Sequence, residues 1–254
     1  MSFVFLIGPA GSGKTTMTKT LLEYLRESGE KVSAVNLDPG VVYLPYRPDY
    51  DVREIVELRE LMLREKLGPN GGLLRAHEIM LANIDKIVKR IRELALTSSF
   101  ILIDTPGQLE LFALKELGSR VISHLRGRGT VGVFLVDATS IKRPSDVVMN
   151  ILLALAVQFH LDIEIAFVLN KIDLVSKETI KLLDTFFMDP EEFLRHLSKR
   201  DQGTFAELAG ELIGIIHEFL PPTRLVAVSA VKRENIEDLY SIIHDALCEC
   251  GDLT

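Results

Sequence analysis

The sequence predicts an α/β fold: three layers with a mostly parallel central sheet and a helical insertion. Short apolar runs alternate with helical patterns, and a helix joins the first two runs. Such a strand–helix–strand unit makes its strands parallel, because the helix carries the chain back to the same end of the sheet. The run Phe100-Ile101-Leu102-Ile103 is typical of a strand buried on both faces. We expect one domain over residues 1–254.

Composition narrows the class of protein. The 254 residues are 47% hydrophobic and 26% charged, as in ordinary globular proteins, and the net charge of −7 argues against direct nucleic-acid binding. No apolar run approaches the roughly 18 residues of a membrane span, so we expect no membrane contact. The two cysteines, Cys248 and Cys250, form no disulfide framework, so we expect reduced thiols in a cytoplasmic protein.

The first expected strand, residues 3–7, and the first helix, residues 14–27, enclose a glycine-rich turn. The turn matches G-x-x-x-x-G-K-[ST], the phosphate-binding P-loop, through Gly8, Gly11, Ser12, Gly13, Lys14, Thr15 and, next to it, Thr16. Glycines let backbone N–H groups surround phosphate oxygens, and the helix N-terminus adds positive potential. Lys14 would reach the β- and γ-phosphates and Thr15 would ligate Mg²⁺. The alternative is a strand-to-helix turn that binds nothing.

The second strand is expected at residues 31–36 and ends in Leu37-Asp38-Pro39-Gly40. Parallel strands end at one edge of the sheet, so Asp38 faces the phosphates. A dinucleotide-binding interpretation would put Asp38 on a ribose, but Thr16 stands where the third glycine of that motif belongs. Asp38 can also be a turn residue before Pro39.

Residues 41–53 and the helical segments after them are the least regular part of the chain. Two prolines and three tyrosines in 41–53 predict an extended, partly mobile segment near the active site, whose tyrosines pack either on a partner or within the loop. A helix–loop–helix is expected at about 54–96, with a first helix ending near Lys66 and a second over 84–94. Gly68-Pro69-Asn70 is predicted to end the first helix and to connect it to the second.

The third strand, at residues 100–103, ends in Asp104-Thr105-Pro106-Gly107-Gln108. An acid at such a tip after a P-loop is a magnesium residue more often than a structural turn. Gly107 can place its N–H on a γ-phosphate, and Gln108 can orient the attacking water. Four cations between residues 115 and 128 form either a solvated helix face or a source of a transition-state arginine; they are Lys115, Arg120, Arg126 and Arg128.

Two further strands, at residues 131–136 and 164–169, lead to the motif N-K-x-D, with a helix over 144–159 between them. The motif is Asn170, Lys171 and Asp173. The Asp173 carboxylate can accept from the two donors of guanine, whereas adenine would leave it unpaired. Asn170 can contact the other base edge, and the Lys171 stem can cover the ring. A helical insertion is expected at about 176–220, then a strand at 225–228 and a loop, Ser229-Ala230, whose N–H groups can reach the guanine carbonyl.

The ordered set of motifs resembles the GPN-loop GTPases, a family in the P-loop class of signal-recognition and nitrogenase-iron-type nucleotidases. The match covers nearly the whole chain: the P-loop, Asp38-Pro39, Gly68-Pro69-Asn70, the Asp104 loop, N-K-x-D and Ser229-Ala230. The resemblance implies a homodimeric switch that hydrolyses GTP to GDP, with Asn70 acting on the nucleotide of the other subunit. It also implies that Asp38, Asp104 and Gln108 surround Mg²⁺ and the attacking water.

Eukaryotic members of that family take part in RNA polymerase assembly, so the resemblance also implies a protein partner. Two other functions remain open from the residues. One is a non-catalytic assembly factor gated by GTP binding, although Thr15, Asp104 and Gln108 favour hydrolysis. The other is a P-loop kinase for a small acceptor, in which N-K-x-D would have no role.

Overall fold

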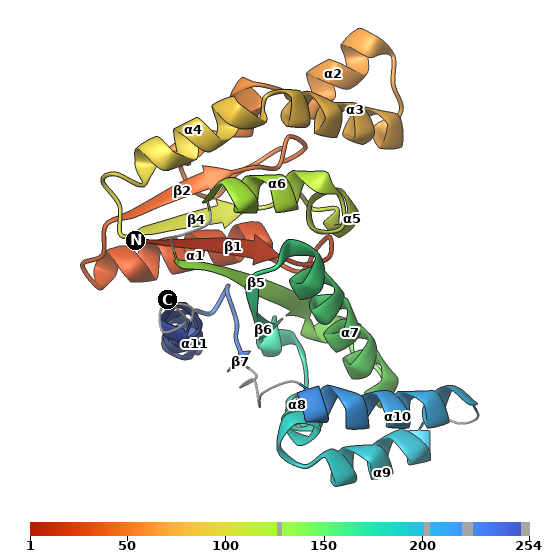
Figure 1. Cartoon of the computed structure of the whole chain (residues 1–254). Helices are drawn as coiled ribbons and strands as arrows, with labels where there is room; N and C mark the ends of the chain where they lie inside the picture. Colours follow the sequence, from red (N-terminus) through yellow and green to blue (C-terminus); the bar gives the residue numbers. More distant parts are fainter. Residues whose placement is uncertain (126–128, 201–203, 220–225, 250–254) are drawn as a thin grey trace.

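A computed structural model describes residues 1–125, 129–200, 204–219 and 226–249 of the chain. The strands are β1 (Ser2–Ile7), β2 (Val32–Asn36), β3 (Tyr50–Asp51), β4 (Phe100–Asp104), β5 (Gly129–Asp137), β6 (Glu164–Asn170) and β7 (Val226–Ala227). They form one sheet in the order β3-β2-β4-β1-β5-β6-β7, and each of these pairings is parallel. Figure 1 shows this sheet with helices on both faces, which confirms the predicted three-layer α/β fold.

The central strand shows why the sheet is covered on both sides. Alternate residues of a strand point to opposite faces, and all five residues from Phe3 to Ile7 are fully buried. Phe3, Phe5 and Ile7 join the core beneath α4 (Ile84–Leu94), α6 (Glu116–Leu125) and α7 (Pro144–Leu161). Val4 and Leu6 join the core beneath α1 (Lys14–Glu27) and α11 (Ile236–Glu249).

The register of the strands brings the loop-forming ends into line. Asp104 at the end of β4 pairs with Leu6 of β1 on one side and with Asn36 of β2 on the other. At the other half of the sheet, Asp137 of β5 pairs with Asn170 of β6. All the polar loops singled out in the sequence therefore leave the same edge of the sheet.

The Gly-Pro-Asn segment begins a helix, which corrects the expected connection. Helix α2 (Leu58–Glu65) ends at Lys66, which adopts the left-handed conformation (φ 54°) and donates its N–H to Met62. Gly68 is then the N-cap of α3 (Pro69–Ala82), a helix missing from the expectation. Proline is tolerated in the first turn because its missing N–H would have no partner in the helix. Asn83 separates α3 from α4, so the segment holds three helices.

The segment at residues 41–53 is more ordered than expected. Its end forms β3 at the sheet edge and the 3₁₀ turn η1 (Val52–Glu54). Tyr46 and Tyr50 are buried, whereas Tyr43 is 77% exposed. Two of the three tyrosines therefore pack within this chain, and one faces solvent.

The remaining elements surround the second half of the sheet. They are α5 (Leu109–Ala113), the 3₁₀ turns η2 (Ala138–Ser140) and η3 (Ile172–Leu174), and the helices α8 (Lys177–Met188), α9 (Pro190–Arg200) and α10 (Thr204–Phe219). The last three fall in the expected insertion and form a cluster beside α7 (Figure 1). Residues 201–203 and 220 of this expected insertion lie outside the described residues, as does Cys250.

By length and composition alone, helix α7 is apolar enough to cross a membrane. The sequence had predicted no apolar run of that length, so this finding corrects the prediction. In the fold it packs against β6, α6 and α10. Val147, Val148, Ile151 and Val157 are buried in the core beneath it. Packing on the sheet therefore accounts for these four residues, whereas Met149 and Phe159 of the same helix are 62% and 81% exposed.

Candidate functional site

The P-loop wraps closely around its own backbone between β1 and α1. Gly8 (φ 148°) and Gly13 (φ 98°) both have backbone angles that side chains disfavour. A Cβ atom on Gly8 would lie 2.4 Å from the Leu135 carbonyl oxygen, and one on Gly13 would lie 2.4 Å from Asn170 Nδ2. Glycine is therefore required at both positions: at Gly8 because of the backbone of β5, and at Gly13 because of the Asn170 side chain at the end of β6.

Lys14 lies in the mouth of this loop. Its ammonium group donates to the carbonyl oxygens of Gly8 at 2.7 Å and Pro9 at 3.0 Å. Burial lowers the pKa of Lys14, and the nearby carboxylates of Asp104 and Asp38 oppose that shift. The side chain is 6% exposed, so its charge acts in a region of low dielectric, where its field on a bound phosphate is strong.

Asp104 is the most deeply buried carboxyl group of the site. It is fully buried, its Oδ2 accepts a hydrogen bond from the Tyr46 hydroxyl at 3.0 Å, and its Oδ1 has no partner within hydrogen-bond distance among the described residues. Burial raises the pKa of Asp104 to about 6, although the hydroxyls of Thr15 and Tyr46 oppose the shift. An unpaired oxygen on a buried carboxyl is costly unless a cation or donor completes it.

Asp38 connects the loop after β2 to the loop after β4. Its Oδ1 accepts from the Gly40 N–H at 2.8 Å, and its Oδ2 accepts from the Gly107 N–H at 3.2 Å. Burial raises the pKa of Asp38, and those two N–H groups oppose the shift. The structure thus brings Asp38, Asp104, Gly107 and Lys14 together, and in this state the Gly107 N–H expected to meet a phosphate is bonded to Asp38.

Four of the five residues expected to read guanine line one cleft of about 240 Å³, which we call the base cleft: Asn170, Lys171, Asp173 and Ala230. The rest of its lining is Gly13, Thr16, Leu174 and Val231. Asn170 joins three loops, because its Nδ2 donates to the Ser12 carbonyl at 2.9 Å and its Oδ1 accepts from the Ala230 N–H at 3.1 Å. The phosphate loop and the base cleft are therefore held in one fixed arrangement.

Two further contacts orient Asp173 and Lys171. The Ser229 hydroxyl donates to Asp173 Oδ1 at 2.6 Å, while the carboxylate of Asp173 remains exposed to the cleft. The Lys171 ammonium group donates to Asp137 Oδ2 at 2.6 Å. That ion pair engages the charged end of Lys171, a residue that lines the cleft, so its aliphatic stem is available to a ring.

Asn70 and Gln108 lie at the surface, outside the hydrogen bonds that join this cluster. Asn70 is exposed in the first turn of α3, and Gln108 is exposed at the N-terminus of α5. Neither side chain makes a hydrogen bond within the part of the chain that the structure describes. Arg120 is exposed and paired with Glu116 at 2.8 Å, as on a solvated helix face; Arg126 and Arg128 lie outside the described residues.

Tyr46 and Asp137 were not among the expected site residues. Asp137 had a detectable signal, because it follows a buried strand that ends at the same edge as Asp104 and Asn170. Tyr46 had none: its proline-flanked loop has no periodic pattern, and 58 positions separate it from the carboxylate that it contacts.

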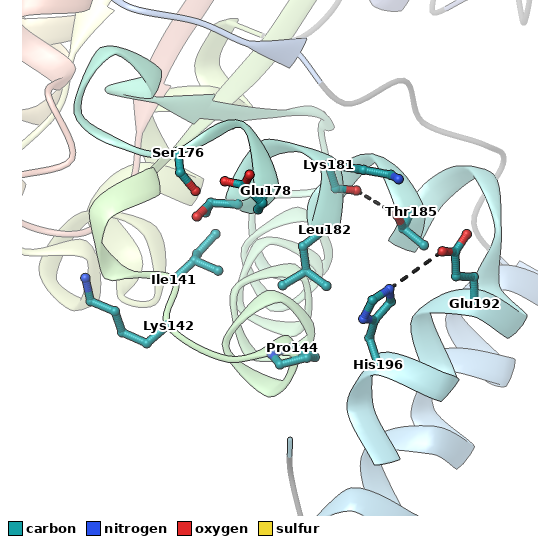
Figure 2. A pocket seen from close by; sticks show the side chains of 11 residues that line it. Ile141, Lys142, Pro144, Ser176, Glu178, Lys181, Leu182, Thr185, Glu192 and His196 are labelled. Carbon is teal, nitrogen blue, oxygen red and sulfur yellow. Dashed lines mark hydrogen bonds and ion pairs between the residues drawn. The ribbon is translucent and has the colours of Figure 1, made fainter. Parts of the chain in front are cut away.

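A larger cavity, of about 460 Å³, lies outside this cluster, between the start of α7 and the helices α8 and α9. Figure 2 shows Ile141, Leu182 and Pro144 around its centre and the ion pair of His196 with Glu192 at its edge. It shares no residue with the base cleft. Residues of the P-loop and of the N-K-x-D motif line the smaller cleft, and none of them lines this cavity.

The chain is similar to known proteins over almost its whole length. A family model described as a conserved hypothetical ATP-binding protein matches residues 6–249. The GPN-loop GTPase PAB0955 of Pyrococcus abyssi is 37% identical over 251 residues, which span 99% of both chains. The GPN-loop GTPase QQT1 of Arabidopsis thaliana is 32% identical, over 94% of this chain and 82% of its own length.

A solved structure gives the same result. The crystal structure of the Pyrococcus abyssi protein, described as a GTPase in apo form, matches with a TM-score of 0.89 and 34% identity, over 97% of this chain and 98% of that one. By comparison of sequences alone, GPN-loop GTPase 1 of Dictyostelium discoideum is 29% identical, over 94% of this chain and 60% of its own length.

Proposed function

This chain belongs to the GPN-loop GTPases, and we propose that it hydrolyses GTP as a Mg²⁺-dependent homodimeric switch. The observation that carries the proposal is the fully buried carboxyl of Asp104, whose Oδ1 lacks a partner within hydrogen-bond distance among the described residues. A cation at this place would complete the coordination of a group that the fold has otherwise desolvated.

The residues present fit magnesium. This ion is usually bound through one or two carboxylates together with substrate phosphates and waters. Thr15 and Asp104 would hold it, with Asp38 beside them. Bound there, the ion would supply positive charge that neutralises the negative charge developing on the transferred phosphoryl group.

The chain's own residues supply positioning and charge. Lys14 would exchange the carbonyl oxygens of Gly8 and Pro9 for phosphate oxygens, and the Gly107 N–H would turn from Asp38 to the γ-phosphate. Gln108 is exposed at the start of α5, from which it can orient a water for in-line attack. Such a mechanism uses preorganised charge rather than a covalent intermediate.

Asp173 is proposed to select guanine. The family description names ATP, whereas the relatives are GTPases, so nucleotide preference is the first experiment. Wild-type protein should bind GTP in strong preference to ATP in calorimetric titrations. Asp173→Asn should weaken the binding of GTP and strengthen the binding of xanthosine triphosphate, because the amide can donate to the xanthine 2-oxygen. Equal binding of ATP, or an unchanged preference in the variant, would contradict the assignment.

The dimer is supported by the tip formed by α2 and α3. Asn70 is exposed there, and Leu63 of α2 and Leu74 of α3 are 73% and 47% exposed. The tip is also linked to the site, since the Leu58 N–H donates to the Pro39 carbonyl at 2.9 Å. A change at Asp38 can therefore move α2, and we propose that Asn70 acts on the nucleotide of a second subunit.

Mixing two inactive variants tests action across the interface. Asn70→Ala should lower hydrolysis with little change in GTP affinity, and Lys14→Ala should remove nucleotide binding. If Asn70 acts in trans, a mixed dimer has one complete site, and an equal mixture regains up to about a quarter of wild-type activity. If Asn70 acts in cis, no activity returns. Light scattering with GDP and with a GTP analogue reports whether dimers form, and a fully active monomer would contradict the proposal.

A further inference from the structure

A buried tyrosine contacts the carboxylate to which the proposed function assigns the cation. Tyr46 is 9% exposed, and its hydroxyl donates to Asp104 Oδ2 at 3.0 Å. Because Asp104 Oδ1 has no partner within hydrogen-bond distance in the part of the chain that the structure describes, the two oxygens have different environments. One accepts from a neutral donor, and the other is buried without such a bond.

The chain segment that carries Tyr46 is fastened on both sides. Before it, the Val41 carbonyl accepts from Arg53 Nη1 at 3.1 Å. After it, Asp49 makes two bonds with the backbone of Ala34: its carboxylate accepts at 2.8 Å and its own N–H donates at 2.7 Å. Arg53 is held in turn by Asp51. The position of the Tyr46 hydroxyl is therefore set by β2 and β3.

The hydroxyl of Tyr46 and its ring have separable roles. The ring belongs to the core between the sheet and α1, so phenylalanine can replace its packing. The hydroxyl adds no charge of its own and leaves the negative charge of Asp104 for a cation. Lys14 differs in this respect, because its ammonium group competes for the same charge.

We propose that Tyr46 is a positioning residue for the cation: its hydroxyl holds Asp104 Oδ2 and thereby turns Oδ1 toward Mg²⁺. The inference rests on the proposed function, since it assigns a role toward the ion proposed there. Hydrogen-bond partners of metal-binding side chains typically change metal affinity about 10- to 100-fold when removed.

The test is Tyr46→Phe in the full chain. Binding of a fluorescent GTP analogue is measured over a range of Mg²⁺ concentrations and in EDTA, and GTP hydrolysis is followed over the same range. We expect affinity in EDTA to stay within about twofold of wild type, while the Mg²⁺ concentration for half-maximal effect rises about 10-fold in both assays.

Tyr50→Phe is a matched control. Tyr50 is 2% exposed on the same segment, and its hydroxyl has no hydrogen-bond partner in the described residues. Its variant should keep the wild-type Mg²⁺ response. In an Asp104→Asn background, Tyr46→Phe should have no further effect on that response, because the carboxylate that the hydroxyl orients is gone.

The outcomes distinguish a failure of the positioning role of Tyr46 from a failure of the proposed function. A Mg²⁺-dependent wild type with an unchanged Tyr46→Phe variant would overturn the inference alone. A tighter Mg²⁺ response in the variant would also overturn it, because Tyr46 would then be competing with the ion. A wild type that ignores Mg²⁺ would overturn the proposed function and this inference together. An equal shift in Tyr50→Phe would assign the effect to packing and overturn the positioning role.

Discussion

Single side chains that join separate loops determine the geometry of the site. Asn170 connects the P-loop to Ala230, Asp38 connects the loops after β2 and β4, and Asp137 anchors Lys171. Each bond joins residues at least 34 positions apart in sequence. The base cleft is therefore preorganised by contacts across strand ends.

Asp137→Asn should weaken guanine-nucleotide binding. Burial raises the pKa of Asp137, but hydrogen bonds from Lys171 and Thr139 outweigh it and the pKa is lowered, so the carboxylate is charged at neutral pH. The asparagine loses the ion pair that holds the Lys171 stem, and we expect GDP affinity to fall about three- to fivefold in calorimetry. Glu23→Gln removes an exposed ion pair with Lys19 and should change nothing. Equal affinities in the two variants would contradict the role of Asp137.

At the scale of elements, the contact between α2 and α3 is close because of one glycine. A Cβ atom on Gly72 would lie 2.5 Å from Met62 Cγ and 3.2 Å from Leu58 Cδ1. At the adjacent Gly71, the nearest atom would be 3.6 Å away, at ordinary contact distance. Both glycines lie within α3. Comparing alanine substitutions at the two positions therefore distinguishes the effect of packing from the effect of helix propensity.

Gly71→Ala and Gly72→Ala should have opposite effects on stability. Alanine favours a helix interior over glycine by up to about 1 kcal/mol, so Gly71→Ala should raise the free energy of unfolding. Gly72→Ala should lower it by about 1 kcal/mol, because overpacking outweighs the same gain. Urea unfolding measures both. Stabilisation by Gly72→Ala would show that α2 can move away at little cost.

At the scale of the whole molecule, a histidine of α3 is buried where this helix meets the helices that cover the sheet. His77 is 9% exposed and its Nε2 has no hydrogen-bond partner in the described residues. Burial lowers the pKa of His77 from its ordinary value near 6.5, and the positive charge of Lys115 lowers it further. The folded protein therefore favours the neutral ring, whereas the unfolded chain takes up a proton more readily.

Stability should consequently fall as pH drops below about 6.5. The contribution of His77 is fully present above that pH and is lost as the pH falls toward its lowered folded-state pKa. Thermal unfolding of His77→Gln should show a smaller decrease between pH 7 and 5 than wild type. His160→Gln, at an exposed histidine of α7, serves as the control. Parallel curves for wild type and His77→Gln would contradict this assignment.

Local patterns in the sequence were sufficient for the layer order, the parallel sheet and the motifs that belong to a GPN-loop GTPase. Strand periodicity and the P-loop are properties of a few consecutive residues, and local physics specifies them. The same local reasoning failed for α3, because Gly68-Pro69 can stop one helix or begin another. Only the left-handed Lys66 decided between them.

Tertiary structure alone decided which side chains meet. The bond from Tyr46 to Asp104, the unpaired Oδ1 beside it and the pair of Asp137 with Lys171 all depend on the register of parallel strands. Register aligns the ends of strands that are far apart in the chain, and no local pattern records which loop residues it brings into contact. The sequence by itself therefore determined the class of chemistry, while the fold determined how the residues that perform it are held.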